Sequence, residues 1–124
     1  MYNSTPEKKI FDIKERTFRF GVEIVKLVLT LPKNSAGFAI SGQLVRSGTS
    51  IGANVIEAQN CGTKKEFIYT LTISLKEARE TEYWLKIINE VKLADKDLVD
   101  KLLIEVNELI KILTSIIKKS KLNN

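Results

Sequence analysis

The strongest constraint on the fold is a row of apolar residues toward the C-terminal end of the sequence, spaced alternately by three and four positions. The row consists of Val99, Leu102, Val106, Leu109, Leu113 and Ile116. This spacing places successive side chains on one face of an α-helix, because a helix completes a turn about every 3.6 residues. An apolar helix face has to be buried against another element. We therefore expect a helix over about 95–118, capped by Asp95 and packed into a helical core.

Three earlier segments show the same helical spacing, and no segment alternates apolar and polar residues as a strand does. The first row is Phe18, Val22, Val25 and Leu29, the second is Ile40, Leu44, Ile51 and Val55, and the third is Leu71, Leu75, Ala78 and Leu85. These rows predict helices over about 12–31, 36–59 and 64–92. We expect Asp12 to cap the first of them.

The breaks between these segments are short and carry residues that end or start helices. Pro32 ends the first helix, because the residue before a proline is pushed out of the helical conformation. Gly62 predicts a helix stop, and Thr63 with Glu66 three positions later predicts a capping box. Short connections make consecutive helices antiparallel neighbours. A chain of 124 residues suits one core, so the sequence predicts a single all-α domain over 1–124, an antiparallel up-down-up-down four-helix bundle.

The segment 36–59 has two further faces besides its apolar row. Ser41, Gly48 and Gly52 form a stripe of small residues. Because a glycine inside a helix costs about 1 kcal/mol relative to alanine, we expect a neighbouring helix to approach closely there. The other face is polar and consists of Gln43, Arg46, Ser50, Asn54 and Glu57. It is interpreted either as a hydrated helix surface or as a buried or interfacial polar network.

The segment 64–92 carries a second apolar side, formed by Ile73, Trp84 and Ile88. This side needs cover from a further helix or from another subunit, which favours self-association. Glu82 falls within the first apolar row of the same segment, where a carboxylate needs a cation or hydrogen-bond donors. Arg46 is the partner that we expect for it.

The net charge of +5 is unevenly distributed along the chain. Residues 24–65 contain five cations and one acid, residues 66–108 contain six cations and ten acids, and residues 109–124 contain four cations and no acid. A positive balance is compatible with an acidic partner such as nucleic acid. The alternating sign also fits pairing of these segments within the bundle or between subunits. Lys118 and Lys119 suit the negative end of a helix dipole, so helix capping explains them without RNA.

Residues that could carry catalysis or bind a metal are scarce. The absence of histidine excludes Glu-x-x-His metal sites and Ser-His hydrolase triads. No glycine-rich phosphate loop occurs, and Glu77, Glu80 and Glu82 are expected to point to different faces of their helix. Cys61 is the single cysteine, and no apolar run approaches the ~20 residues that span a bilayer. We expect a cytoplasmic protein without enzyme activity, cofactor, metal or membrane contact.

Two stretches of the sequence resemble a known bacterial family. They are QLVRSGTSIGANVIEAQ, residues 43–59, and KKEFIYTLTISLKEARETEYWLKII, residues 64–88. The most specific marks are Gln43, Arg46, Ser50, Ile51, Asn54 and Glu57 in the first stretch and Ala78, Glu80, Tyr83, Trp84 and Leu85 in the second. Both resemble the four-helix bundle family of 23S rRNA intervening-sequence proteins, which implies a homopentamer. The chain is similar also to the accessory variability protein of diversity-generating retroelements, which implies association with nucleic acid.

Two functions compete on this basis. The first is a non-enzymatic oligomer that associates with RNA or another nucleic acid through phosphate contacts. Its candidate contacts are Lys8, Lys9, Arg16, Arg19, Lys64, Lys65, Lys118 and Lys119. The alternative is an oligomeric scaffold that recruits a protein partner through Trp84, Ile73 and Ile88 or a polar rim, without touching nucleic acid. The candidates for a polar network or interface are Gln43, Arg46, Ser50, Asn54, Glu57, Glu80, Glu82 and Trp84.

Overall fold

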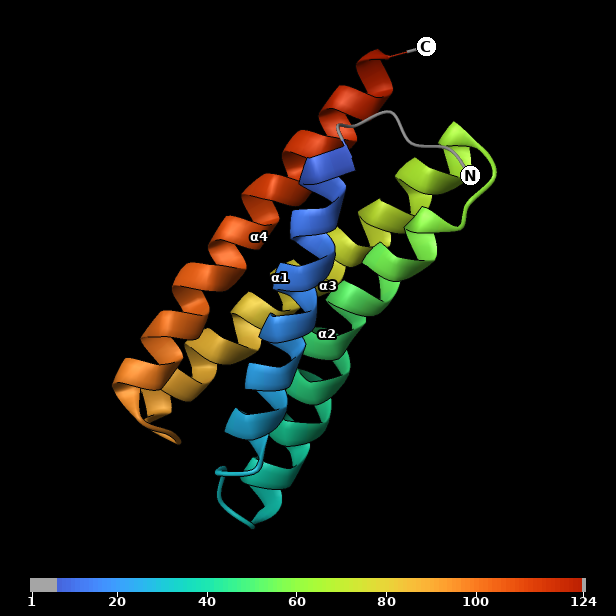
Figure 1. Cartoon of the computed structure of the whole chain (residues 1–124). Helices are drawn as coiled ribbons and strands as arrows, with labels where there is room; N and C mark the ends of the chain where they lie inside the picture. The colour runs from blue at the N-terminus through green and yellow to red at the C-terminus, as the bar shows by residue number, and fades with distance from the viewer. Residues whose placement is uncertain (1–6, 124) are drawn as a thin grey trace.

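The computed structural model describes residues 7–123, with side chains described from Ile13 onward, and contains four antiparallel α-helices in that range (Figure 1). They are α1 (Glu7–Val28), α2 (Ser35–Gln59), α3 (Lys64–Val91) and α4 (Lys96–Leu122). Each helix packs against the one that precedes it, and α4 closes the bundle with a sparser contact to α1. The predicted all-α up-down-up-down bundle is confirmed. No helix within the described residues is long and apolar enough to cross a membrane.

The first and last helices of the chain, α1 and α4, differ from the prediction at their ends. α1 begins at Glu7, so Asp12 lies inside the helix and the prediction that it is the N-cap is wrong. Nothing in the sequence between Glu7 and Asp12 breaks a helix, and helix formation propagates once it has started. α1 ends at Val28 and α4 extends to Leu122, past the predicted end near residue 118.

The helix starts are capped largely as predicted. The amide of Glu66 donates to Thr63 Oγ1 at 3.1 Å, which confirms Thr63 as the N-cap of α3. The Glu66 carboxylate accepts from the Thr63 hydroxyl at 3.2 Å, in place of the backbone amide that a capping box uses. The amide of Leu98 donates to Asp95 Oδ2 at 3.1 Å, which confirms Asp95 as the N-cap of α4. Gly62 is not the helix stop, because α2 already ends at Gln59 and no described glycine adopts a positive φ.

The turn between α3 and α4 contains a left-handed residue that is not glycine. Lys92 has φ 58° and ψ 44°, in the region that costs a residue with a Cβ about 1–2 kcal/mol. The turn is closed by the amide of Leu93, which donates to the carbonyl of Ile88 at 3.1 Å. This pattern is a Schellman-type helix end in which lysine occupies the position that glycine favours.

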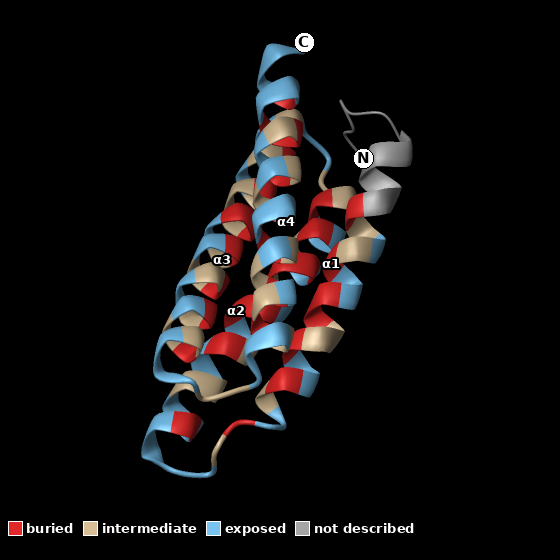
Figure 2. Ribbon diagram, turned by 90° about the vertical axis from the view of Figure 1, so that its left-hand side faces the viewer, coloured by how far each residue is buried: buried red, intermediate tan, exposed pale blue. Residues whose placement is uncertain are grey.

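The core lies between the inner faces of all four helices (Figure 2). Every member of the predicted α4 row is buried, as are Leu71, Leu75, Ala78 and Leu85 of α3. The predicted α2 row is buried except for Ile40, which is half-buried. Ile88, assigned from the sequence to a second apolar side of α3, belongs to this core with 0 % exposure.

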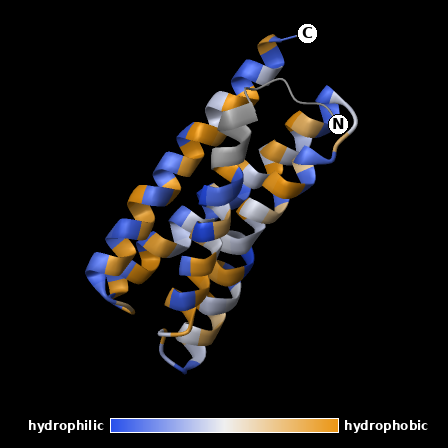
Figure 3. Ribbon diagram, in the orientation of Figure 1, coloured by the Kyte–Doolittle hydropathy of each residue, from blue (hydrophilic) through white to orange (hydrophobic). Residues whose placement is uncertain are grey.

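The predicted apolar row of α1 faces outward. Phe18 is 61 % exposed, Val25 39 % and Leu29 70 %. The core face of α1 is formed instead by Ile13, Phe20, Ile24, Leu27 and, just past the helix, Leu31. Hydrophobic residues dominate the lower half of α1 in Figure 3. Helical spacing therefore identified a real apolar face, but α1 has two of them, and the tertiary packing buries the other one.

The small residues of α2 allow a close approach of α1. A Cβ at Gly48 would lie 2.8 Å from Ile24 Cγ2, and a Cβ at Gly52 would lie 3.2 Å from the backbone carbonyl of Thr17. Both positions are buried. The expected close neighbour of this stripe is thus a helix of the same chain.

The seam between α2 and α3 contains hydroxyl groups that bond across the two helices. Ser74 Oγ donates to the carbonyl of Ile51 at 2.7 Å, and Thr81 Oγ1 donates to Ser47 Oγ at 2.9 Å. All three side chains are fully buried. Because buried hydroxyls are costly without partners, these bonds fix the register of α2 against α3.

Candidate nucleic-acid interface

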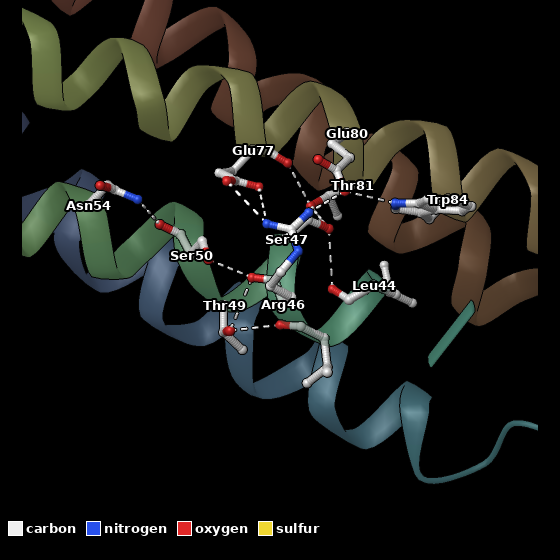
Figure 4. Close-up of polar contacts among 11 residues, drawn as sticks. Leu44, Arg46, Ser47, Thr49, Ser50, Asn54, Glu77, Glu80, Thr81 and Trp84 are labelled. Carbon is white, nitrogen blue, oxygen red and sulfur yellow. Dashed lines mark hydrogen bonds and ion pairs between the residues drawn. The ribbon is translucent and has the colours of Figure 1, made fainter. Parts of the chain in front are cut away.

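One polar cluster joins α2 to α3 around Arg46 (Figure 4). Arg46 Nη1 lies 3.1 Å from a carboxylate oxygen of Glu77, and Nη2 donates to Glu80. The Trp84 indole N–H donates to the same Glu80 oxygen at 3.1 Å. Glu77 and Glu80 therefore converge on one guanidinium, whereas the sequence predicted that they point to different faces.

The predicted partner of Arg46 is wrong. Glu82 is half-buried on another side of α3, where its carboxylate lies 4.0 Å from Lys86 Nζ. The rotation between positions 80 and 82 is about 200° at ~100° per residue, so both cannot face α2. The spacing in the sequence does not predict whether Glu80 or Glu82 pairs with Arg46, because the pairing depends on how α3 is rotated relative to α2.

The contacts around Glu80 favour its ionised form. The Trp84 indole N–H and the Arg46 guanidinium hold the pKa of the Glu80 carboxyl below its ordinary value. The hydrogen bond to Glu80 and the charge of Glu77 raise the pKa of Arg46. Since the Arg46 side chain remains 49 % exposed, the cluster is a solvent-accessible ion network in which one guanidinium pairs with two carboxylates.

The rest of the polar stripe of α2 is a helix surface. Ser50 Oγ donates to the carbonyl of Arg46 at 2.6 Å, and Asn54 Nδ2 donates to the carbonyl of Ser50 at 2.8 Å. Gln43 and Glu57 are exposed. The two interpretations of this stripe therefore apply to different parts of it: a network at Arg46 and an ordinary surface elsewhere.

The potential nucleophile and metal ligands form no larger group. Cys61 is half-buried, with its sulfur 3.5 Å from Thr70 Oγ1 and 3.6 Å from the carbonyl of Glu57. Across the described part of the chain, no three carboxylates or thiols gather where they could hold a metal ion.

Two of the predicted phosphate contacts on α1 are engaged with carboxylates. Arg16 forms two bonds with Glu105 of α4, at 2.7 Å and 3.0 Å, and so bridges the sparse seam between these helices. Arg19 pairs with Glu15 at 2.9 Å within α1. The side chains of Lys8 and Lys9 lie outside the described residues.

The remaining predicted contacts come together at one end of the bundle. The up-down topology places the start of α1, the α2–α3 loop and the end of α4 at the same end (Figure 1). The described cations there, which we call the basic end, are Lys64, Lys65, Lys118, Lys119 and Lys121. None of the five forms an ion pair with a described residue. Two acids, Glu57 and Glu66, lie near them.

The opposite end of the bundle has no such excess. There the α3–α4 turn alternates in sign through Glu90, Lys92, Asp95, Lys96 and Asp97. Lys96 is paired with Asp100 at 2.8 Å, and the bond lowers the pKa of the Asp100 carboxyl. The positive surface is therefore concentrated at the basic end.

Sequence reasoning missed an exposed apolar groove between α1 and α2. Its lining includes Phe18, Val22, Val25, Ala53 and Ile56, with Gly21 and Gly52 at its floor. Ile56 is 46 % exposed, and Phe38, further along α2, is 62 % exposed. The signal was present, because residues 35–59 contain only Arg46 and Glu57 as charged residues, and a helix apolar on several sides needs cover on several sides.

Sequence reasoning also missed a row of cations and tyrosines on the outer face of α3. We call it the α3 stripe, and its members are Lys65, Tyr69, Lys76, Arg79, Tyr83 and Lys86. All six are exposed. The spacing of four, seven, three, four and three positions is visible in the sequence.

Comparison with known proteins agrees with the fold and the sequence motifs. The chain is similar to the crystal structure of a protein of unknown function from the S23 ribosomal protein family of Bacteroides thetaiotaomicron, with a TM-score of 0.83 and 39 % identity. The similarity covers 89 % of this chain and 98 % of that one. The comparison with curated proteins gave no match. The family model described as 23S rRNA-intervening sequence protein matches residues 9–115. The chain therefore belongs to the family of 23S rRNA-intervening sequence proteins.

Proposed function

We propose that this protein is a non-enzymatic, self-associating bundle that holds RNA at its basic end. The observation that carries the proposal is the gathering of five lysines at that end without carboxylate partners among the described residues. By contrast, Arg16, Arg19 and Arg46 are already neutralised by glutamates. Unpaired cations are the groups that release counterions when they meet phosphates. We propose RNA as the polyanion because the family name refers to 23S rRNA.

Helix capping accounts for only part of the basic end. Lys119 and Lys121 lie in the last turn of α4, where a cation interacts favourably with the helix dipole. Lys64 and Lys65 lie at the start of α3, where the dipole disfavours cations. Helix capping therefore does not explain Lys64 and Lys65. Their position at an unfavourable helix end supports contact with an external anion.

The groove between α1 and α2 supports self-association. Phe18, Val25 and Ile56 are more than a third exposed and share one continuous surface. A second copy of the chain is the partner that the family resemblance implies, as a homopentamer. This surface replaces the one expected from the sequence, since Ile88 is in the core and Ile73 and Trp84 are half-buried.

Binding of a fluorescent RNA hairpin, followed by anisotropy at low salt, tests the RNA part of the proposal. We expect wild type to bind and Lys118→Glu/Lys119→Glu to bind at least tenfold more weakly. Lys96→Glu/Lys101→Glu is the matched control, because it makes the same charge change on α4 toward the opposite end of the bundle. Absence of binding by wild type, or equal losses in the two variants, would reject the basic end as the RNA site.

Light scattering coupled to gel filtration tests self-association. We expect an oligomer for wild type and a smaller species for Phe18→Glu/Ile56→Glu, because both changes put charges into the groove. A strictly monomeric wild type would refute this part. A partner protein that remains bound to wild type after nuclease treatment, with no RNA binding, would favour the scaffold function instead.

A further inference from the structure

The α3 stripe combines positive charge with exposed aromatic rings. Its four cations are Lys65, Lys76, Arg79 and Lys86, and its two tyrosines are Tyr69 at 68 % and Tyr83 at 58 % exposure. At ~100° per residue the six side chains fall within an arc of about 100° on one helix face. Both tyrosines leave ring surface exposed beside the cations, and the Tyr83 ring also meets the Trp84 ring in a T-shaped contact with the centroids 5.2 Å apart.

No carboxylate interrupts the stripe between its first and last members. Glu80 lies just beside it but is held by Arg46 and Trp84, and Glu82 lies on another side of α3 but pairs with Lys86, the last member of the stripe, at 4.0 Å. Lys65, Lys76 and Arg79 form no ion pair with any described residue. The contact with Arg46 thus partly offsets the charge of Glu80, and three of the four stripe cations stay without a carboxylate partner among the described residues.

The stripe is continuous with the basic end. It begins at Lys65, which belongs to both surfaces, and follows α3 as far as Lys86. At ~1.5 Å per residue its length is about 32 Å, and Tyr69 and Tyr83 are about 21 Å apart along the helix. At ~3.4 Å per stacked nucleotide, the whole stripe corresponds to about nine nucleotides.

We propose that the α3 stripe is a track for single-stranded RNA, on which bases stack on Tyr69 and Tyr83 and phosphates contact the four cations. Exposed aromatic rings beside cations are the combination that binds single strands, because every unpaired base offers a face for stacking. A duplex keeps its bases stacked inside and gains only the phosphate contacts. The inference deepens the proposed RNA function and rests on it: the basic end would receive the RNA, and the stripe would favour its unpaired segments.

The stripe and the groove proposed for self-association are separate surfaces of one chain. Among the described residues, α1 contacts α2 and α4 but not α3. The groove between α1 and α2 therefore faces a different side of the bundle from the outer face of α3. The groove of one copy therefore does not overlap the stripe of the same copy.

The test compares a single-stranded U12 RNA with a hairpin of the same labelled length, by anisotropy on the full chain. For Tyr69→Ala/Tyr83→Ala we expect affinity for U12 to fall about tenfold or more, because stacking on each ring is lost. Affinity for the hairpin should stay within about twofold. Tyr69→Phe/Tyr83→Phe keeps both rings and should bind U12 as wild type does. Circular dichroism at the binding temperature confirms that each variant is folded.

Charge variants provide the second arm. Lys76→Glu/Arg79→Glu should weaken U12 binding more than the matched control Lys96→Glu/Lys101→Glu. Wild type should reach full affinity only with strands of about nine nucleotides or longer, given a track of ~32 Å.

The outcomes separate the two proposals. Failure of wild type to bind either RNA would overturn both. Unchanged U12 binding by the tyrosine-to-alanine variant, together with weaker binding by Lys118→Glu/Lys119→Glu, would overturn the track and leave the basic end standing. Capture of an acidic protein by the stripe, without U12 binding, would also overturn the track.

Discussion

The close approach of α1 to α2 makes a specific prediction about two glycines of the same helix. An alanine Cβ at position 48 would lie 2.8 Å from Ile24 Cγ2 and 2.9 Å from Ile24 Cγ1. Ile24 is fully buried and branched at that point, so it cannot swing aside. An alanine Cβ at Gly42 meets nothing within 4 Å. The same substitution is therefore crowded at one site and unhindered at the other.

The magnitudes follow from helix propensity and packing. Either substitution gains about 1 kcal/mol of helix propensity. Overpacking a dense core costs about 1–3 kcal/mol, which applies to Gly48→Ala alone. We expect Gly42→Ala to stabilise the protein by up to about 1 kcal/mol and Gly48→Ala to be neutral or destabilising by up to about 2 kcal/mol.

Urea unfolding followed by circular dichroism measures both variants, at one fixed protein concentration because association would contribute to stability. The difference between the two free energies of unfolding isolates the contact with Ile24, since the propensity gain is shared. If Gly48→Ala stabilised the protein as much as Gly42→Ala, the helices would not approach as described.

Three further predictions concern local features of α3. Lys92→Gly should raise the free energy of unfolding by about 0.5–1 kcal/mol, measured in urea, because glycine adopts the left-handed conformation without strain; a loss would contradict that conformation. Thr63→Ala should cost about 1 kcal/mol by the same assay, because an N-cap bond is lost, and no change would mean that the cap is not formed. Glu80→Gln should be less stable than wild type near neutral pH. Because contacts in the folded state lower the pKa of Glu80, this difference should persist above the ordinary carboxyl pKa and vanish as pH falls through the folded value; a difference that grew on acidification would refute the ion network.

Most of the fold could be predicted from the sequence because α2, α3 and α4 each have one dominant row of apolar residues that packs into the core. α4 is the clearest case: all six members of its row are buried, and its N-cap is the predicted Asp95. The predicted row of α1 failed for a physical reason. Phe18 and Phe20 each belong to a helical apolar face, and only packing against α2 and α4 decides which face is covered.

The candidate site was less predictable because it depends on how helices are turned and paired. Arg46 pairs with Glu77 and Glu80 and not with Glu82. This pairing depends on how α3 is rotated about its own axis, which the spacing of residues in the sequence does not determine. The basic end joins Lys64 to Lys118 across a long stretch of sequence, and it emerges only once the up-down topology brings those helix ends together. The α3 stripe, in contrast, was readable from residue spacing without any structure.

The salt dependence of RNA binding tests the central claim most directly. Five phosphate contacts from the lysines of the basic end predict a slope of about −4.5 for log K against log salt on a hairpin, at ~0.9 per contact. Lys118→Glu/Lys119→Glu should reduce the magnitude of that slope to about 2.7 or less. A wild-type slope near zero, or one that the variant leaves unchanged, would contradict an RNA site at the basic end.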